Sequence, residues 1–327
     1  MDRRKFLYVI ASGAAGATLV ASPSAAQKVF RIAHFYGSRA GNLADSFIQG
    51  LNDFGYFEGK NIILERRVAE VGPPMFESFP PMAAELIRSG LDVFVAGTAT
   101  IAQIIQKETT SVPIVALGVH DGVAVGLFES LARPGRNMTG IDTMAPNLDA
   151  KRLQLAKEVL PGLSHLTVLL DPTFPGAEIH RVRIAPAAET LGMTVRFVEV
   201  SSIPDVAPAL AAILANGTDA VYVIPAPLIF GSRKEIIDFG ALHKLPMFHE
   251  FKVFVEDGGL LSYGPDINQI WRRGGYYVDR ILKGHKAGDI PVEQPTTFDL
   301  AINLTTAKAL GIQFPHHLIA SASAVIE

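Results

Sequence analysis

Short apolar runs alternate with longer amphipathic segments along the chain, and this alternation constrains the fold more than any other feature. Continuous apolar runs are typical of parallel strands that are buried on both faces. Between them, apolar residues recur three and four positions apart, which predicts helices with one buried face. In the first half, we expect strands at Phe30 to Phe35, Ile62 to Arg67, Val93 to Ala96 and Ile114 to Leu117, and helices at Leu43 to Phe54, Phe76 to Ser89, Thr98 to Glu108 and Val123 to Leu131.

The second half repeats this layout, so the sequence predicts an α/β protein with two similar lobes, each built on a parallel sheet. A further segment follows, which suggests that the chain crosses between the lobes more than once. In this half, we expect strands at Leu166 to Leu170, Thr194 to Val198, Ala220 to Ile224, Met247 to Phe248, Gly259 to Gly264 and Phe298 to Ile302, helices at Ala177 to Leu191, Val206 to Ala215, Glu235 to His243, Ile267 to Leu282 and Thr305 to Leu310, and a linker at Gly284 to Pro295.

The first 26 residues have the features of an export signal. Arg3, Arg4 and Lys5 precede a short apolar run, and Ser24-Ala25-Ala26 offers the small residues that a signal peptidase reads. The paired arginines followed by Phe-Leu resemble a twin-arginine signal. The run is too short and weak for a membrane span, which was the alternative. We therefore expect cleavage after Ala26 and a periplasmic protein without an anchor.

Composition excludes several classes of function. The net charge is -3 and no basic patch occurs, so nothing favours nucleic acid as a partner. The chain has no cysteine, which excludes disulfides, thiolate metal sites and a lipid-modified cysteine. A hydrophobic fraction of 49% with 19% charged residues is typical of an ordered globular chain.

Several stretches are similar in order and spacing to the substrate-binding proteins of ABC importers of the TrpX-like family. The resemblance covers about the whole chain after residue 26. It is carried by Phe47-Ile48-Gln49-Gly50-Leu51, Gly55-Tyr56-Phe57-Glu58-Gly59-Lys60-Asn61-Ile62, Leu131-Ala132-Arg133-Pro134-Gly135-Arg136-Asn137-Met138-Thr139-Gly140, Lys151-Arg152-Leu153, Glu158-Val159-Leu160-Pro161, Phe254-Val255-Glu256-Asp257-Gly258-Gly259-Leu260-Leu261-Ser262-Tyr263-Gly264-Pro265 and Ile290-Pro291-Val292-Glu293-Gln294-Pro295.

This resemblance implies the type I periplasmic binding protein fold, in which two Rossmann-like lobes are joined by three crossover hinge strands. It places the crossings near Gly140 to Ala145, Leu261 to Pro265 and Glu293 to Thr297. One lobe would then comprise residues 27–142 with 264–292, and the other residues 143–263 with 293–327. It also implies a monomer that binds a small molecule, such as an aromatic amino acid or a similar carboxylate, and delivers it to permease and ATPase subunits at the inner membrane.

Ligands of open α/β sheets bind beyond the carboxyl ends of the strands, so the loops that follow the strands supply the candidate binding residues. Gly97 to Thr100 has the best physical argument, because free amide groups at a helix start, with hydroxyl groups beside them, bind an anion such as a carboxylate. The alternative is that Thr98 or Thr100 only caps this helix. The candidates are Tyr36, Gly37, Ser38, Gly97, Thr98, Ala99, Thr100, Asp121, Asp171, Thr173, Pro225 and Glu250.

Two carboxylates and several aromatic residues among these loops suggest further ligand contacts. Asp121 or Glu250 is expected to take a ligand ammonium group, although a structural role for Glu250 remains the alternative. Rings near the strand ends can stack on a planar ligand; they are Phe35, Tyr36, Phe174 and Phe230. Phe35 is expected to be buried instead. Trp271 is expected on the back of the first lobe, where its fluorescence would report little on binding.

The sequence gives no sign of catalysis, a cofactor or a metal site. Neither a Gly-x-Ser-x-Gly elbow nor a Gly-x-Gly-x-x-Gly loop occurs. His243, His249 and Glu250 lack the one-face spacing of a zinc helix, and His316-His317 is expected in a terminal loop without a third ligand. We therefore expect a binding protein, with a ligand sensor for a membrane receptor, or an exported α/β enzyme, as the alternatives.

Overall fold

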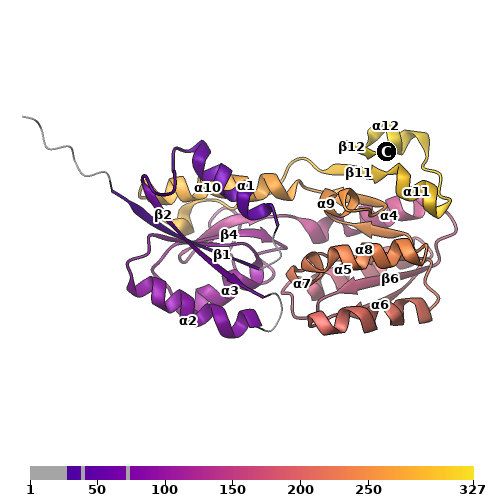
Figure 1. Cartoon of the computed structure of the whole chain (residues 1–327), viewed down its shortest axis with the longest axis horizontal. Coiled ribbons are helices and arrows are strands. Elements are labelled where there is room, and N and C mark those ends of the chain that lie inside the picture. The colour runs from indigo at the N-terminus through magenta and orange to yellow at the C-terminus, as the bar shows by residue number, and fades with distance from the viewer. Residues whose placement is uncertain (1–27, 38–40, 71–73) are drawn as a thin grey trace, which may run out of the picture.

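The computed structural model describes residues 28–37, 41–70 and 74–327, which form two α/β lobes side by side (Figure 1). The expected fold class is confirmed, since each lobe is built on a largely parallel sheet covered by helices. The predicted export signal lies outside the described residues.

The first lobe contains a five-stranded parallel sheet. Its central strands are buried on both faces, as their continuous apolar runs predict. In sheet order the strands are β2 (Ile62–Ala69), β1 (Phe30–Gly37), β3 (Val93–Ala96), β4 (Ile114–Val119) and β5 (Met138–Asp142).

The second lobe contains a seven-stranded sheet in which the β10–β11 pair is antiparallel and every other pair is parallel. Leu169 belongs to the core on one face of this sheet, whereas Val168 and Leu170 belong to the core on the other face. In sheet order the strands are β12 (Ala324–Ile326), β11 (Asp299–Asn303), β10 (Leu261–Gly264), β9 (Met247–His249), β8 (Ala220–Val223), β6 (His165–Leu170) and β7 (Thr194–Glu199).

Helices cover both faces of each sheet. In the first lobe α1 lies against α10 on one face, and α2 lies against α3 on the other (Figure 1). The helices are α1 (Leu43–Asp53), α2 (Pro74–Arg88), α3 (Ala99–Glu108), α4 (Asp149–Val159), α5 (Ala177–Thr190), α6 (Val206–Ala215), α7 (Pro227–Gly231), α8 (Arg233–Leu242), α9 (Lys252–Glu256), α10 (Ile267–Leu282), α11 (Leu304–Leu310) and α12 (His316–Ser321), and short 3-10 turns lie at Ala145–Leu148, Ile203–Asp205 and Ala287–Asp289.

The chain passes between the two sheets at three places. It leaves β5 for the 3-10 turn at Ala145–Leu148, leaves β10 for α10, and returns from the 3-10 turn at Ala287–Asp289 to β11. On the last passage Glu293 pairs with Ile141 beside β5, so two of the passages lie next to each other. The two lobes are therefore joined by three segments of the chain.

The helix expected at Val123 to Leu131 is wrong. The amide of Val125 donates to Asp121, which closes a single helical turn, but Gly126 then adopts a φ of +74° and the chain leaves the helix. The sequence also missed α4, α7, α9 and β12, most of which are short, and it expected only a crossing segment where β5 lies. His316-His317 is not in a loop: it begins α12, where His317 bonds Glu158.

We predict that Gly50→Ala lowers the free energy of unfolding by about 1–3 kcal/mol. A Cβ at position 50 would lie 1.9 Å from the carbonyl oxygen of Arg272 in α10, so the two helices must separate. The helix propensity of alanine, worth about 1 kcal/mol, does not offset this clash. Urea unfolding tests the effect, with Gly162→Ala as the control because nothing lies within 4 Å of a Cβ there. Equal stability of both variants would contradict the close helix contact.

Candidate functional site

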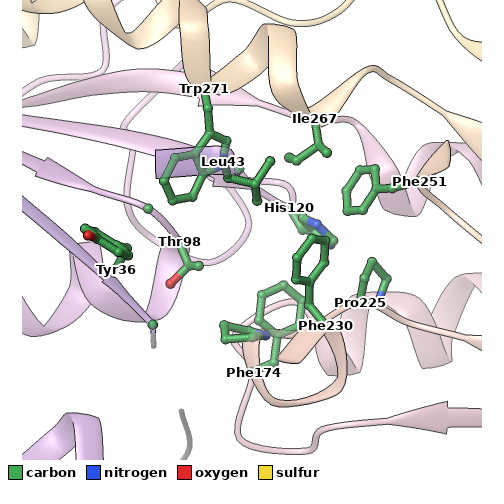
Figure 2. Close-up of a pocket in the computed structure, with 14 residues that line it drawn as sticks. Tyr36, Leu43, Thr98, His120, Phe174, Pro225, Phe230, Phe251, Ile267 and Trp271 are labelled. Carbon is green, nitrogen blue, oxygen red and sulfur yellow. The ribbon is translucent and has the colours of Figure 1, made fainter. Parts of the chain in front are cut away.

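A cavity between the two lobes is the candidate functional site (Figure 2). It encloses about 620 Å³ of empty space, part of which is open to solvent. Residues at or just beyond the carboxyl ends of β1, β3 and β4, together with residues of α1 and α10, form one wall, and residues beyond β6, β8 and β9 form the other. The lining residues are Tyr36, Gly37, Leu43, Gly97, Thr98, Gly118, His120, Phe174, Pro225, Pro227, Phe230, Phe251, Ile267 and Trp271.

Trp271 lies on α10 and reaches the cavity from the first lobe (Figure 2). Its ring is 3% exposed and packs edge-on to His34, with ring centres 5.4 Å apart. A Cβ at Gly97 would lie 2.6 Å from this ring, so glycine at that position makes room for it. The expectation that Trp271 lies on the back of the lobe is therefore wrong. Helix α10 does cover the lobe, but its side chains Ile267 and Trp271 line the cavity.

The start of α3 contributes a polar group, the hydroxyl of Thr98, to the first-lobe wall. Thr98 has an extended backbone, and its hydroxyl oxygen accepts a hydrogen bond from the amide of Ile101 at 3.3 Å. Thr98 is therefore the N-cap of the helix, and it also lines the cavity. The positive end of the helix dipole thus lies at the cavity wall.

The second-lobe wall is formed by rings. Phe174, Phe230 and Phe251 face the first lobe across the cavity (Figure 2). Phe174 is placed by a turn in which the carboxylate of Asp171 accepts hydrogen bonds from both the amide and the hydroxyl of Thr173, at 2.8 and 2.6 Å. Burial raises the pKa of the Asp171 carboxyl, and the Thr173 hydrogen bonds oppose this effect. This wall therefore suits a planar apolar ligand.

His120 connects the cavity to a buried polar cluster in the second lobe. Its Nδ1 lies 3.2 Å from Nε2 of His180, and Nδ1 of His180 lies 2.8 Å from the carboxylate of Asp149. Burial lowers the pKa of His120 well below 6.5, and the charges of His180 and Arg152 act in the same direction. His120 is therefore a neutral ring that links the two lobes beneath the cavity.

Arg152 lies at the centre of the same cluster and is 1% exposed. It donates to the carbonyl oxygens of Ala145 and Tyr263 at 2.7 and 2.6 Å, which places it against two of the three passages between the lobes. It also donates to the hydroxyl of Tyr222 at 2.9 Å and lies 3.5 Å from Glu250. Burial raises the pKa of the Glu250 carboxyl, and Arg152 opposes the rise.

His120, His180 and Glu250 are the residues here that could hold a metal ion, because ligand atoms from all three lie within 4.8 Å of one another. The sequence did not suggest this group, since its members come from three separate loops or helices. The positive charge of Arg152 beside Glu250 opposes a cation, and the bond between the two histidines already uses Nδ1 of His120 and Nε2 of His180. The arrangement fits a hydrogen-bonded network better than a metal site.

The structure places some of the predicted site residues at the cavity and others elsewhere. Tyr36, Gly37, Gly97, Thr98 and Pro225 line it. Ala99, Thr100, Asp171 and Thr173 lie beside lining residues without lining the cavity themselves, and Ser38 lies outside the described residues.

The two predicted ammonium partners do not reach the cavity wall. Asp121 lies 3.5 Å from Arg183 and accepts a hydrogen bond from the amide of Ala124. Glu250 is fully buried beside Arg152, which agrees with the alternative that this residue has a structural role. Phe35 is buried, as expected, whereas Tyr36, Phe174 and Phe230 line the cavity. The sequence missed Leu43 and Ile267, which a loop rule does not select because each is the first residue of a helix, and it missed Phe251, which lies two residues beyond β9.

Two buried histidines predict a loss of stability in acid. His34, behind the cavity wall, and His249 have no hydrogen-bond partner for either ring nitrogen among the described residues. Burial lowers the pKa of each to about 3, with Arg66 adding to the effect at His34. Because the unfolded chain binds these protons near pH 6.5, the stabilising contribution is present above that pH and is lost as the pH falls toward 3.

At pH 5 each of these histidines is expected to reduce the stability by about 2 kcal/mol relative to neutral pH. His249→Leu removes one titrating group while keeping a buried side chain of similar volume. Its unfolding free energy should therefore fall less between pH 7 and pH 5 than that of the unchanged protein. Urea unfolding at both pH values measures the difference, and identical pH dependence would refute the assignment.

Comparisons with known proteins agree on the kind of protein that this architecture represents. The sequence model of the family described as ABC transporter substrate binding protein matches residues 39–326. A tyrosine-binding protein from Clostridioides difficile (strain R20291) is 27% identical over 267 residues, which are 82% of this chain and 76% of that relative.

Solved structures share the same fold. A conserved domain protein from Vibrio cholerae is 27% identical and superposes with a TM-score of 0.84 over 91% of this chain and 100% of that one. The ABC domain from Streptococcus pneumonia in complex with L-Trp is 22% identical and gives the same TM-score and the same coverage of both chains. The two-lobed arrangement is therefore that of the type I periplasmic binding proteins.

Proposed function

Because the chain belongs to the ABC transporter substrate-binding protein family, we propose that it captures a small organic solute between its lobes and delivers it to a permease and ATPase in the membrane. The observation that carries this proposal is the cavity, whose two walls come from different lobes. A ligand that touches both walls stabilises the closed arrangement, since only that arrangement makes both sets of contacts. Binding and release need no chemical conversion of the solute.

The ligand we propose is a small aromatic carboxylate, a class that includes the aromatic amino acids. Five aromatic side chains line the cavity, and they would cover a ring on both sides. The carboxylate would lie at the start of α3, where Thr98 and the first amides of the helix offer hydrogen bonds. The tyrosine-binding relative supports an aromatic ligand.

We propose that the lobes move about the three passages between the sheets. One lobe comprises residues 27–142 with 264–292, and the other residues 143–263 with 293–327. Arg152 touches two of the passages, and Glu293 of the third pairs beside β5, so the hinge residues form one contiguous group. A dissociation constant near micromolar corresponds to about -8 kcal/mol, which a few hydrogen bonds to a carboxylate and one buried ring can supply.

The site of action that we propose is the periplasm, reached through the signal in residues 1–26. In the part of the chain that the structure describes, none of the helices has the length and apolar character that crossing a membrane requires. The joint change Arg3→Lys and Arg4→Lys is expected to keep the protein in the cytoplasm and uncleaved, as judged by cell fractionation. Lys28→Arg, beyond the predicted cleavage site, is the control. Normal export of the double variant would contradict the twin-arginine route.

Thermal melting of the purified protein against amino acids, aromatic acids, sugars and nucleosides tests the proposed function. A ligand that binds only the native state raises the melting midpoint, by an amount that grows with its concentration. We expect aromatic carboxylates to give the largest shifts and their methyl esters to lose most of the shift. Thr98→Ala should weaken the effect as well. Equal shifts for acids and esters would contradict the carboxylate contact, and no shift with any solute would contradict the function.

A further inference from the structure

We infer that the cavity selects aromatic carboxylates that carry no ammonium group over the corresponding aromatic amino acids. This inference rests on the proposed function and narrows its ligand class. It follows from the charges around the cavity. Among the lining residues that the structure describes, none is an aspartate, glutamate, lysine or arginine. The polar side chains on the wall are those of Tyr36, Thr98 and His120.

Carboxylates stand next to the lining residues in the sequence, but each of them is bonded elsewhere. Asp121 follows His120 and lies beside Arg183 at 3.5 Å. Asp266 precedes Ile267 and accepts hydrogen bonds from the amides of Asn268 and Gln269 at the start of α10. Neither carboxylate lines the cavity, so neither is placed to bind an ammonium group there.

The carboxylates on the second-lobe side are held in the same way. Glu250 precedes Phe251, but it is fully buried, and its Oε1 lies 3.5 Å from Arg152 and 3.3 Å from the hydroxyl of Tyr222. Its Oε2 has no hydrogen-bond partner among the described residues and lies 4.0 Å from Nε2 of His120. The carboxylate of Asp171 accepts both hydrogen bonds from Thr173. An ammonium group in the cavity would therefore lose its water without gaining a carboxylate, which is costly in a largely apolar site.

Two further features decide between anionic and cationic ligands. Aromatic rings attract a cation, by about 0.5–2 kcal/mol per well-placed ring. Against this, the positive end of the α3 dipole lies at the wall beside Thr98, and it favours an anion and repels a cation. His120 adds no charge, because burial keeps its ring neutral. The aromatic side chains of the wall complement the ring of an aromatic carboxylate, and the start of α3 complements its acid group. No group among the described lining residues complements an ammonium group in the same way.

Three compounds that share a phenyl ring and a two-carbon chain separate these possibilities. They are 3-phenylpropionate with the acid alone, L-phenylalanine with acid and ammonium, and 2-phenylethylamine with the amine alone. Calorimetric titration of the purified protein should give the tightest binding for 3-phenylpropionate, at least tenfold weaker binding for L-phenylalanine, and the weakest for the amine. Tighter binding of L-phenylalanine than of 3-phenylpropionate would overturn the inference and leave the proposed function standing.

The same titrations distinguish the other outcomes. Tightest binding of the amine would show a cation site formed by the rings and would overturn the inference. If none of the three compounds binds and the wider panel gives no melting shift, the proposed function fails together with the inference. If sugars or nucleosides alone give shifts, the protein binds a solute but the aromatic ligand class is wrong, and the inference falls with it.

A charge added to the wall provides the matched variant. Pro227 lines the cavity at the first position of α7, where a carboxylate is compatible with the helix start. Pro227→Glu should reduce the preference for 3-phenylpropionate over L-phenylalanine by about tenfold, and Pro227→Gln, with the same shape and no charge, should leave it unchanged. An unchanged preference in Pro227→Glu, or the same change in both variants, would contradict the electrostatic basis of the selection.

Discussion

Replacing Arg152 by methionine is expected to lower the free energy of unfolding by about 3–5 kcal/mol, the largest effect of any single change considered for this protein. The guanidinium is 1% exposed, and it lies between the carboxylates of Asp149 and Glu250, at 3.1 and 3.5 Å. Methionine would fill much of the same volume but leave these buried groups without a positive charge. It would also leave the carbonyl oxygens of Ala145 and Tyr263 without their donor.

Urea unfolding measures this loss, and Lys151→Met is the control. Lys151 is the preceding residue of α4, is exposed, and donates a long hydrogen bond of 3.5 Å to Gln154. The control should change the stability by less than about 0.5 kcal/mol. If both variants unfold at the same urea concentration, the cluster around Arg152 does not hold the second lobe and the hinge together.

Replacing Trp271 by leucine is expected to weaken the binding of 3-phenylpropionate about a hundredfold, which corresponds to roughly 2.7 kcal/mol. The indole supplies the largest ring on the cavity wall, and leucine is too small to cover the same area of a bound ligand. Calorimetric titration gives the affinity, and thermal melting verifies that the variant is folded.

Tyr276→Leu is the matched control, because it removes a ring from another face of the same helix. Tyr276 contacts Phe54 and the guanidinium of Arg273, and it does not line the cavity. The affinity of the Tyr276→Leu variant for 3-phenylpropionate should stay within about threefold of that of the unchanged protein, a difference of roughly 0.6 kcal/mol. Equal losses in the two variants would place the role of Trp271 in the fold and not in binding.

Most of the fold could be predicted from the sequence because its elements have strong, regular patterns. The bounds of Val93–Ala96, Val206–Ala215 and Ile267–Leu282 were predicted to the residue. The prediction was wrong at Val123 to Leu131, where apolar spacing suggested a helix but Gly126 takes a left-handed backbone. Spacing describes which face a helix would bury, but it does not show whether the backbone can continue through a glycine.

The candidate site was predictable only in part, because strand ends can be read from the sequence but side-chain directions cannot. Thr98 follows β3 and Tyr36 lies at the carboxyl end of β1, and both line the cavity. Trp271 lies on a helix, and its position at the cavity depends on how α10 packs across Gly97. Likewise, Glu250 follows a strand as a ligand contact would, but Arg152, far away in the sequence, holds it inside the second lobe.

The emission of Trp271 during a ligand titration tests the central claim most directly, since the chain contains one tryptophan and its ring lines the proposed site. The phenyl compounds do not absorb at wavelengths that excite an indole, so they do not disturb the measurement. The titrant is the phenyl compound that binds most tightly. We predict a saturable change in emission that follows the calorimetric binding curve with one site per chain. Calorimetric binding with unchanged Trp271 emission would show that the ligand binds elsewhere and would contradict the account.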